Sequence, residues 1–207
     1  MESVNSLRSG FTIHFTSKTT DVDFNLPTLL TLLRIALIPV LVIFFYLPWA
    51  LANVACTVIF ILAAFTDWLD GYLARKMGQA TAFGAFLDPV ADKLMVGVVL
   101  VLIVQADPSP YLAIPSAVII GREITIASLR EWMAEVGQRK KVEVSWLGKV
   151  KTMAQMIAIS CLLYKESFLG ISMNTLGYVF LYIAAVLTLW SMINYLKVAL
   201  PSMIANG

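Results

Sequence analysis

The sequence predicts an all-α integral membrane protein with six transmembrane helices, and two observations support this class. Of the 207 residues, 59% are hydrophobic and only 14% are charged, whereas a soluble domain carries about a quarter of its residues as charged side chains. A spanning helix needs about 20 mostly apolar residues, because the hydrocarbon core of a bilayer is about 30 Å thick. Six segments reach this length, at residues 28–47, 51–73, 83–105, 111–134, 146–165 and 174–198.

Composition also excludes several functions. The formal net charge of +2 is too small for a general nucleic-acid-binding protein. Cys56 and Cys161 both lie in apolar runs, and His14 is the only histidine, so neither a disulfide framework nor a histidine-ligated zinc site is expected. We expect residues 1–24, rich in Ser, Thr and Asp, to form a disordered extension, residues 25–200 to form one six-helix domain, and residues 201–207 to form a C-terminal tail.

The distribution of basic residues predicts the orientation in the membrane, because Lys and Arg are retained on the cytoplasmic side. Between the spans, the connections on one side carry most of the basic residues, and those on the other side carry only Lys165. Both termini are therefore expected in the cytoplasm. The basic residues on the cytoplasmic side are Arg8, Lys18, Arg75, Lys76, Arg139, Lys140, Lys141 and Lys197.

Four aspartates lie inside the predicted spans. Asp67 and Asp70 belong to the second span, and Asp88 and Asp92 belong to the third. An aspartate at the centre of a spanning helix costs about 2.5 to 3.5 kcal/mol, so four of them require neutralising partners. Ion pairs with basic side chains such as Lys93 could explain these aspartates by structure alone. For a single aspartate, this structural explanation is as good as a functional one.

The spacing of these aspartates places them on matching helix faces, because each helical residue turns by 100°. Two facing stripes of carboxylates form an all-oxygen cavity, which suits hard divalent cations such as Mg²⁺ or Mn²⁺, often bound as a pair. Small residues on the same faces leave room for a ligand, although close helix packing also explains them. The faces comprise Asp67, Asp70, Gly71, Ala74 and Arg75 on one helix and Gly84, Asp88 and Asp92 on the next.

In order, the region reads Asp67, two residues, Asp70-Gly71, two residues, Ala74-Arg75, eight residues, Gly84, three residues, Asp88, three residues, Asp92. All eight fixed positions match the motif of the CDP-alcohol phosphotransferases, and the chain resembles that family. The resemblance implies a cytoplasm-facing polar cavity, usually a homodimer, and metal-dependent displacement of CMP from a CDP-linked lipid or alcohol. It also implies that Asp67, Asp70, Asp88 and Asp92 surround the metal, that Asp92 is the general base, and that Asp67, Asp70, Gly71, Ala74, Arg75 and Gly84 contact the CDP group.

Further stretches resemble one bacterial branch of the family, whose members transfer the phosphatidyl group of CDP-diacylglycerol to glycerol 3-phosphate. These stretches are residues 25–34, Arg122-Glu123, residues 129–132 and residues 148–152. The resemblance therefore implies that CDP-diacylglycerol and glycerol 3-phosphate are the substrates and that the chain lies among lipids of the bacterial inner membrane.

Basic residues in the same stretches suit a phosphate group, because a dianion inside a membrane protein needs several Arg or Lys side chains. Arg122 and Arg130 lie about 80° apart around one helix and can converge. Lys151 points about 200° from Lys149 around the helix. For Lys151, extension of the side chain to the membrane interface is therefore as good an explanation as phosphate binding. Glu123 is interpreted as the partner of an arginine. The predicted glycerol 3-phosphate ligands are Thr31, Arg34, Arg122, Arg130, Lys149 and Lys151.

Other functions stay open from the sequence alone. The acceptor could instead be serine, inositol phosphate or phosphatidylglycerol. Intramembrane carboxylates also occur in divalent-cation channels and carriers, and a membrane adaptor without activity is the simplest alternative. Release of CMP from CDP-diacylglycerol, measured with each acceptor separately, distinguishes these functions, because a channel would release none.

Overall fold

The computed structural model describes residues 26–77, 82–137 and 146–206, and nearly all of them are helical. The helix bounds follow the predicted segments closely, except that the last helix continues past residue 198. The predicted extension at residues 1–24 lies outside the described residues. The helices are α1 (Leu26–Tyr46), α2 (Ala52–Met77), α3 (Ala82–Ala106), α4 (Pro110–Glu135), α5 (Trp146–Tyr164) and α6 (Met173–Asn206).

A short β-hairpin between α5 and α6 is a small departure from the all-α prediction. Strands β1 (Ser167–Phe168) and β2 (Ile171–Ser172) pair antiparallel. The two residues between them, Leu169 and Gly170, both have positive φ angles, of 51° and 80°. A two-residue turn of this kind matches the twist of a hairpin, and it reverses the chain within a few residues.

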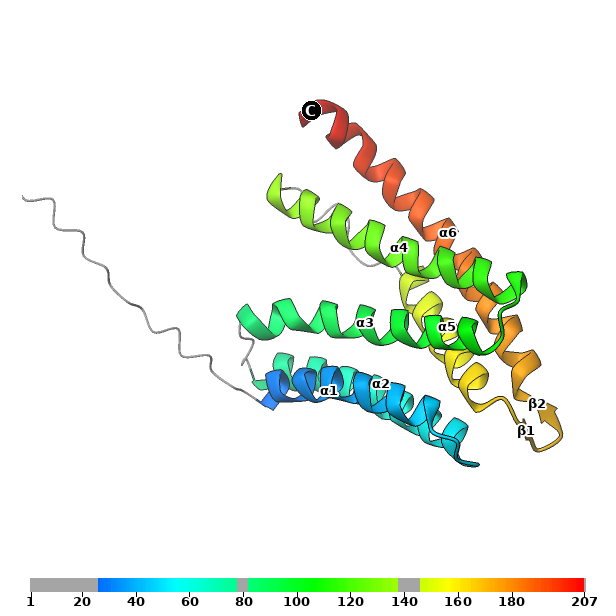
Figure 1. Ribbon diagram of the computed structural model, residues 1–207. Coiled ribbons are helices and arrows are strands. Elements are labelled where there is room, and N and C mark those ends of the chain that lie inside the picture. Colours follow the sequence, from blue (N-terminus) through cyan, green and yellow to red (C-terminus); the bar gives the residue numbers. More distant parts are fainter. Residues whose placement is uncertain (1–25, 78–81, 138–145, 207) are drawn as a thin grey trace, which may run out of the picture.

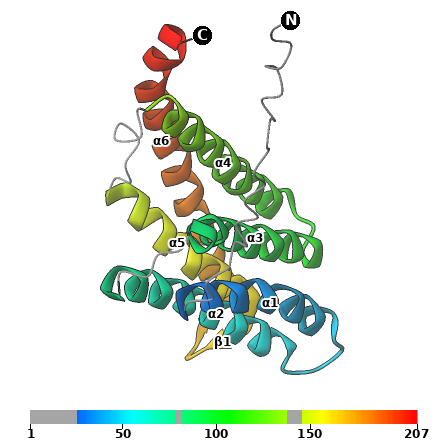
Figure 2. The same ribbon diagram turned by 90° about the vertical axis from the view of Figure 1, so that its left-hand side faces the viewer.

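The six helices pack in a layered arrangement around α3. Figure 1 shows α1 and α2 side by side on one flank of α3, and α4 with α6 on the other. In the turned view of Figure 2, α3 is seen between α4 and the α1–α2 pair. The α5 helix packs against α6 and also contacts α2 and α3. This arrangement brings side chains of α1, α2 and α3 together at one place and side chains of α4, α5 and α6 at another.

The interior of the bundle is apolar, and so is much of its outer surface. Leu41, Phe60, Val99 and Ile159 belong to one buried cluster that joins all six helices. Large apolar side chains such as Trp68, which is 62% exposed, cover the outside. An apolar exterior on this scale is expected of a protein in contact with lipid.

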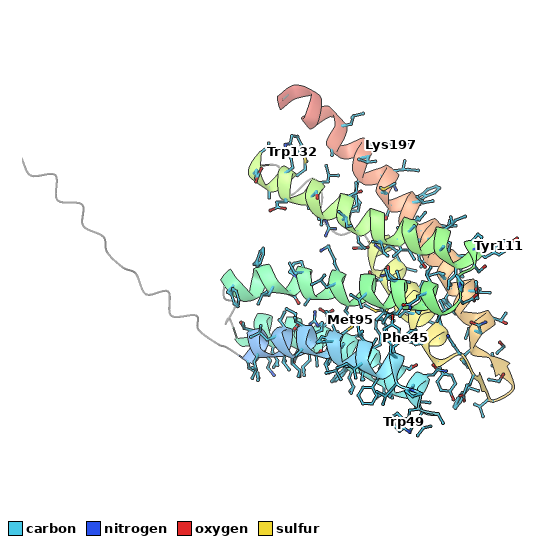
Figure 3. All side chains as sticks on the ribbon, viewed as in Figure 1. Phe45, Trp49, Met95, Tyr111, Trp132 and Lys197 are labelled. Carbon is cyan, nitrogen blue, oxygen red and sulfur yellow. The ribbon has the colours of Figure 1, made fainter. Side chains whose placement is uncertain are left out.

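Among the described residues, four helices are long and apolar enough to cross a membrane, so the chain has the character of a membrane protein. The four candidate spans are Thr28–Tyr46, Ala52–Leu73, Pro110–Glu135 and Met173–Lys197, and α5 contributes a shorter apolar segment. A total of six spans stays a prediction. Figure 3 shows Trp49 and Tyr111 at one end of the bundle and Trp132 towards the other, as interfacial aromatic residues would lie.

Close contact between α5 and α6 depends on Gly177. A Cβ atom at this position would lie 2.7 Å from Leu162 Cγ and 3.1 Å from the Leu162 backbone nitrogen. Neither atom is the end of a flexible side chain, so a larger residue here must push the two helices apart.

We therefore expect Gly177→Ala to lower the stability by about 1 to 3 kcal/mol, as overpacking in a tight interior does. Thermal unfolding of the purified protein in detergent measures the effect. Gly97→Ala is the matched control, because a Cβ at Gly97 meets nothing within 4 Å. Equal midpoints for the two variants would contradict the assigned role of Gly177.

Candidate active site

One buried arginine joins three helices at the acidic end of the site. Arg34 of α1 is only 1% exposed, and its guanidinium contacts carboxylates from α2 and α3. Arg34 Nη1 lies 2.8 Å from Asp67 Oδ1 and 3.3 Å from Asp88 Oδ1, and Arg34 Nη2 lies 2.6 Å from Asp70 Oδ2. Thr31, one turn earlier in α1, donates a hydrogen bond of 3.3 Å to Asp70 Oδ2. We call Arg34, Asp67, Asp70 and Asp88 the acidic cluster.

The acidic cluster fits a divalent cation by its donors and its charge. Asp67, Asp70 and Asp88 each offer an oxygen atom, and these atoms lie within 4.8 Å of one another. Carboxylate oxygens are the ligands that hard divalent cations prefer. Three ionised carboxylates against one guanidinium leave an excess of 3 − 1 = 2 negative charges. A divalent metal site is therefore consistent with these residues.

Small residues lie beside the acidic cluster on both helices. Gly71 follows Asp70 directly in α2, and Gly84 lies one turn before Asp88 in α3. Both glycines are partly accessible to solvent. Ala74 and Arg75 belong to the same helix as Gly71, but the placement of their side chains lies outside the described residues.

Asp92 lies one helical turn beyond Asp88 and lines a separate small cavity of about 30 Å³. Glu123 of α4 and Gln155 of α5 line the same cavity, so three helices meet there. Gln155 Oε1 is buried and has no hydrogen-bond partner within the described part of the chain. The remaining lining residues are Lys93, Val96, Thr152 and Met156.

A basic cluster begins at this cavity. Arg122 Nη1 lies 3.1 Å from Glu123 Oε1, and Lys151 of α5 donates a hydrogen bond to the same oxygen. Arg122 and Lys151 are 7% and 3% exposed, so both cations are held inside the protein. Glu123 thus pairs with a lysine as well as with the arginine that the sequence predicts. Lys149 lies in α5 as well, and its side chain placement is outside the described residues.

Two residues of α6 complete the basic cluster, and neither is among the residues predicted from the sequence. Ser191 Oγ accepts a hydrogen bond of 3.0 Å from Arg122 Nη2, and Tyr195 Oη accepts one of 3.0 Å from Arg130 Nη2. A sequence signal exists, because Thr188, Ser191 and Tyr195 are buried polar residues on one face of an apolar helix. We call Arg122, Glu123, Arg130, Lys151, Ser191 and Tyr195 the basic cluster.

The acidic and basic clusters are connected through α3. Asp88 contacts Arg34 in the acidic cluster, while Asp92 faces the cavity that Glu123 also lines. The structure places Thr31 and Arg34 with the acidic cluster and Arg122, Arg130 and Lys151 in the basic cluster. Asp92 therefore lies one turn from Asp88 of the acidic cluster and lines the same cavity as Glu123 of the basic cluster.

Comparison with known proteins identifies the family of this chain. The model of the CDP-alcohol phosphatidyltransferase family matches residues 24–190, and the chain belongs to this family. The family resemblance predicted from the aspartate motif is confirmed. Among curated relatives is the CDP-diacylglycerol–glycerol-3-phosphate 3-phosphatidyltransferase of Pectobacterium atrosepticum, 55% identical over 178 residues, which cover 86% of this chain and 96% of the relative. Proteins of the same name from Salmonella choleraesuis and Yersinia pestis are 53% and 54% identical over the same shares of each chain.

Removal of Arg34 should destabilise the protein in a way that a divalent cation reverses. Arg34→Ala leaves three buried or half-buried carboxylates without their cation, and loss of one partner of a buried ion pair costs about 3 to 5 kcal/mol. Added Mg²⁺ should raise the unfolding midpoint of Arg34→Ala more than that of the wild type, because binding to the folded state stabilises it. Thermal unfolding with EDTA and with Mg²⁺ measures this difference.

Arg122→Ala is the matched control for this experiment. It also removes a buried guanidinium from a carboxylate, but that carboxylate keeps Lys151 as its partner. Its midpoint should fall without any extra response to Mg²⁺. An equal Mg²⁺ response in both arginine variants would contradict the assignment of the acidic cluster as the cation site.

Proposed function

We propose that this chain transfers the phosphatidyl group of CDP-diacylglycerol to sn-glycerol 3-phosphate, giving phosphatidylglycerol phosphate and CMP. The observation that supports the proposal is a net negative cluster one turn from Asp92 together with a net positive cluster whose Glu123 lines the same cavity as Asp92. A nucleotide diphosphate held by a cation suits the first, and a free phosphate dianion suits the second. The names of the relatives, at over 50% identity across most of the chain, specify the same two substrates.

On the donor side, Asp67, Asp70 and Asp88 would hold one or two divalent cations, Mg²⁺ or Mn²⁺. A cation bound there would supply positive charge opposite the diphosphate and the departing CMP. Arg34 contacts all three of these carboxylates and Thr31 contacts one of them, so we assign both residues to the donor side rather than to the acceptor. The residues proposed to contact the CDP group are Asp67, Asp70, Gly71, Ala74, Arg75 and Gly84.

On the acceptor side, the charge of the basic cluster matches that of glycerol 3-phosphate. Three cations, Arg122, Arg130 and Lys151, against the one carboxylate of Glu123 leave an excess of 3 − 1 = 2 positive charges. A phosphate monoester carries up to two negative charges at neutral pH, so the pairing is close to neutral. Lys149 remains a proposed further ligand in the first turn of α5.

Asp92 is the proposed general base between the two sides. Its carboxylate takes the proton from the 1-hydroxyl of glycerol 3-phosphate as that oxygen attacks the β-phosphorus. The new oxygen–phosphorus bond forms while the bond between the β-phosphorus and the CMP oxygen breaks, and CMP leaves with the electron pair. The basic cluster binds the acceptor phosphate before and during this step.

We also propose six transmembrane helices around a cytoplasm-facing cavity, both termini in the cytoplasm, a location in the bacterial inner membrane, and a homodimer. The basic residues on one side of the spans support the orientation. Such a cavity lets water-soluble glycerol 3-phosphate reach a lipid whose acyl chains stay in the bilayer.

Release of CMP from CDP-diacylglycerol tests the proposed function. Wild-type protein in mixed micelles with Mg²⁺ should release CMP with glycerol 3-phosphate and much more slowly with serine, inositol phosphate or phosphatidylglycerol. Asp88→Asn should abolish the release, because loss of a carboxylate weakens cation binding. Asp107→Asn is the control and should keep activity, since Asp107 follows the far end of α3 and bonds to Tyr178. Faster release with another acceptor would contradict the proposal.

The role of Asp92 predicts a different kinetic signature. Asp92→Asn should lower kcat by about 10² to 10⁴ while the affinity for CDP-diacylglycerol changes little, because a general base acts on the chemical step. Steady-state kinetics with a direct CDP-diacylglycerol binding assay measure both quantities. If Asp92→Asn loses lipid binding as severely as Asp88→Asn does, Asp92 is a cation ligand rather than the base.

A further inference from the structure

We propose that Tyr195 of α6 is a positioning residue that holds Arg122 and Arg130 ready for the acceptor phosphate. The inference rests on the proposed function, because it assigns these arginines to glycerol 3-phosphate. Tyr195 lies in the last third of a long apolar helix and outside the stretches that carry the family resemblance. Its role follows from contacts that only the folded chain reveals.

Tyr195 contacts both arginines through one ring. The guanidinium carbon of Arg130 lies 5.3 Å from the centre of the Tyr195 ring, and that of Arg122 lies 5.8 Å from it. Both distances are within the range of a cation–π interaction. Tyr195 Oη also accepts the hydrogen bond from Arg130 Nη2. A single side chain of α6 therefore fixes two cations that α4 supplies.

The ring itself is held on an apolar support. Tyr195 is 8% exposed and belongs to a small buried cluster between α4 and α6. A tyrosine has only two side-chain torsions, so little freedom remains once the ring is packed. The other buried members of this cluster are Ile126, Leu129, Met133 and Ala199.

The two arginines keep hydrogen-bonding capacity for a ligand. Their Nε atoms are buried without a partner among the described residues. Within the same part of the chain, the guanidinium of Arg130 makes one hydrogen bond, to Tyr195. A guanidinium carries five N–H donors in a fork that matches phosphate oxygens. Buried unpaired donors beside excess positive charge indicate a site arranged in advance for an anion.

This arrangement explains what a tyrosine contributes here. Arginine is a long side chain, and ordering two of them when phosphate binds carries an entropic penalty. Contacts with a rigid ring order both guanidinium groups beforehand, so that less freedom is lost on binding. Tyr195 thus acts through the arginines and needs no contact with the substrate.

Two substitutions separate the ring from the hydroxyl. Tyr195→Phe keeps the ring beneath both cations and removes the hydrogen bond to Arg130, so the KM for glycerol 3-phosphate should rise about 3- to 10-fold. Tyr195→Leu removes the ring as well, and the same KM should rise about 10- to 100-fold. In both variants kcat and the KM for CDP-diacylglycerol should stay within about twofold of the wild type. The reason is that the lost interaction stabilises the bound acceptor and the transition state equally.

Tyr182→Phe and Tyr182→Leu are the matched controls. Tyr182 lies on the same helix, but its hydroxyl donates to the Tyr111 carbonyl oxygen at the other end of α4. These controls should leave all three kinetic constants unchanged. Binding of glycerol 3-phosphate measured by calorimetry, without CDP-diacylglycerol, gives a readout that needs no turnover and should weaken in the same order.

The outcomes are distinguishable. An unchanged KM for glycerol 3-phosphate in a folded Tyr195→Leu protein would overturn the inference. A parallel loss of kcat, of both affinities and of thermal stability would also overturn it, because it would show a structural role only. If the wild type prefers another acceptor, the proposed function fails, and the Tyr195 variants measured with that acceptor still test whether the ring positions the arginines. With either acceptor, an acceptor KM that is raised less in Tyr195→Phe than in Tyr195→Leu supports the inference.

Discussion

The contact of Arg34 with three aspartates is the constraint on which the site depends. A guanidinium that is 1% exposed inside a membrane protein would be very unfavourable alone, and so would the carboxylates around it. Brought together, they satisfy one another and fix α1 against α2 and α3 at this point. The remaining excess of negative charge is what allows a cation to enter later. Folding and cation binding therefore draw on the same group of charges.

A second consequence of this arrangement is the separation of unlike charges along α3. If the basic cluster lay against the aspartates, the two would pair with each other and neither would be available to a ligand. Instead, Glu123 satisfies Lys151 and part of Arg122 locally, while Arg34 satisfies the aspartates. Asp92 lines a small cavity that Glu123 of the basic cluster also lines. Each half of the site retains a net charge of opposite sign, which suits two phosphate-bearing substrates that bind differently.

Much of this organisation could be predicted from the sequence, because membrane helices are limited by simple rules of length and polarity. The helix bounds and the approach of Asp67, Asp70 and Asp88 follow from apolar runs and from periodicity. The partner of each charge could not be predicted in this way. Arg34 was predicted as a ligand of glycerol 3-phosphate because a phosphate needs cations, and in the structure it contacts aspartates. Periodicity on one helix indicates a face but not which other helix covers it. Tyr195 was missed for the same reason, since its importance comes from two residues that lie 65 and more positions earlier in the chain. The turn at Leu169 and Gly170 was also missed, because Leu is an uncommon residue at positive φ.

The length of α6 has a mechanical consequence. A helix of 34 residues is about 51 Å long, whereas the hydrocarbon core of a bilayer is about 30 Å thick, so α6 must tilt or project into water. Tyr195 lies towards its projecting end and is bound to Arg122 and Arg130 of α4. These contacts join α6 to α4 at the level of the basic cluster, so a change in the tilt of α6 must either carry α4 with it or break them.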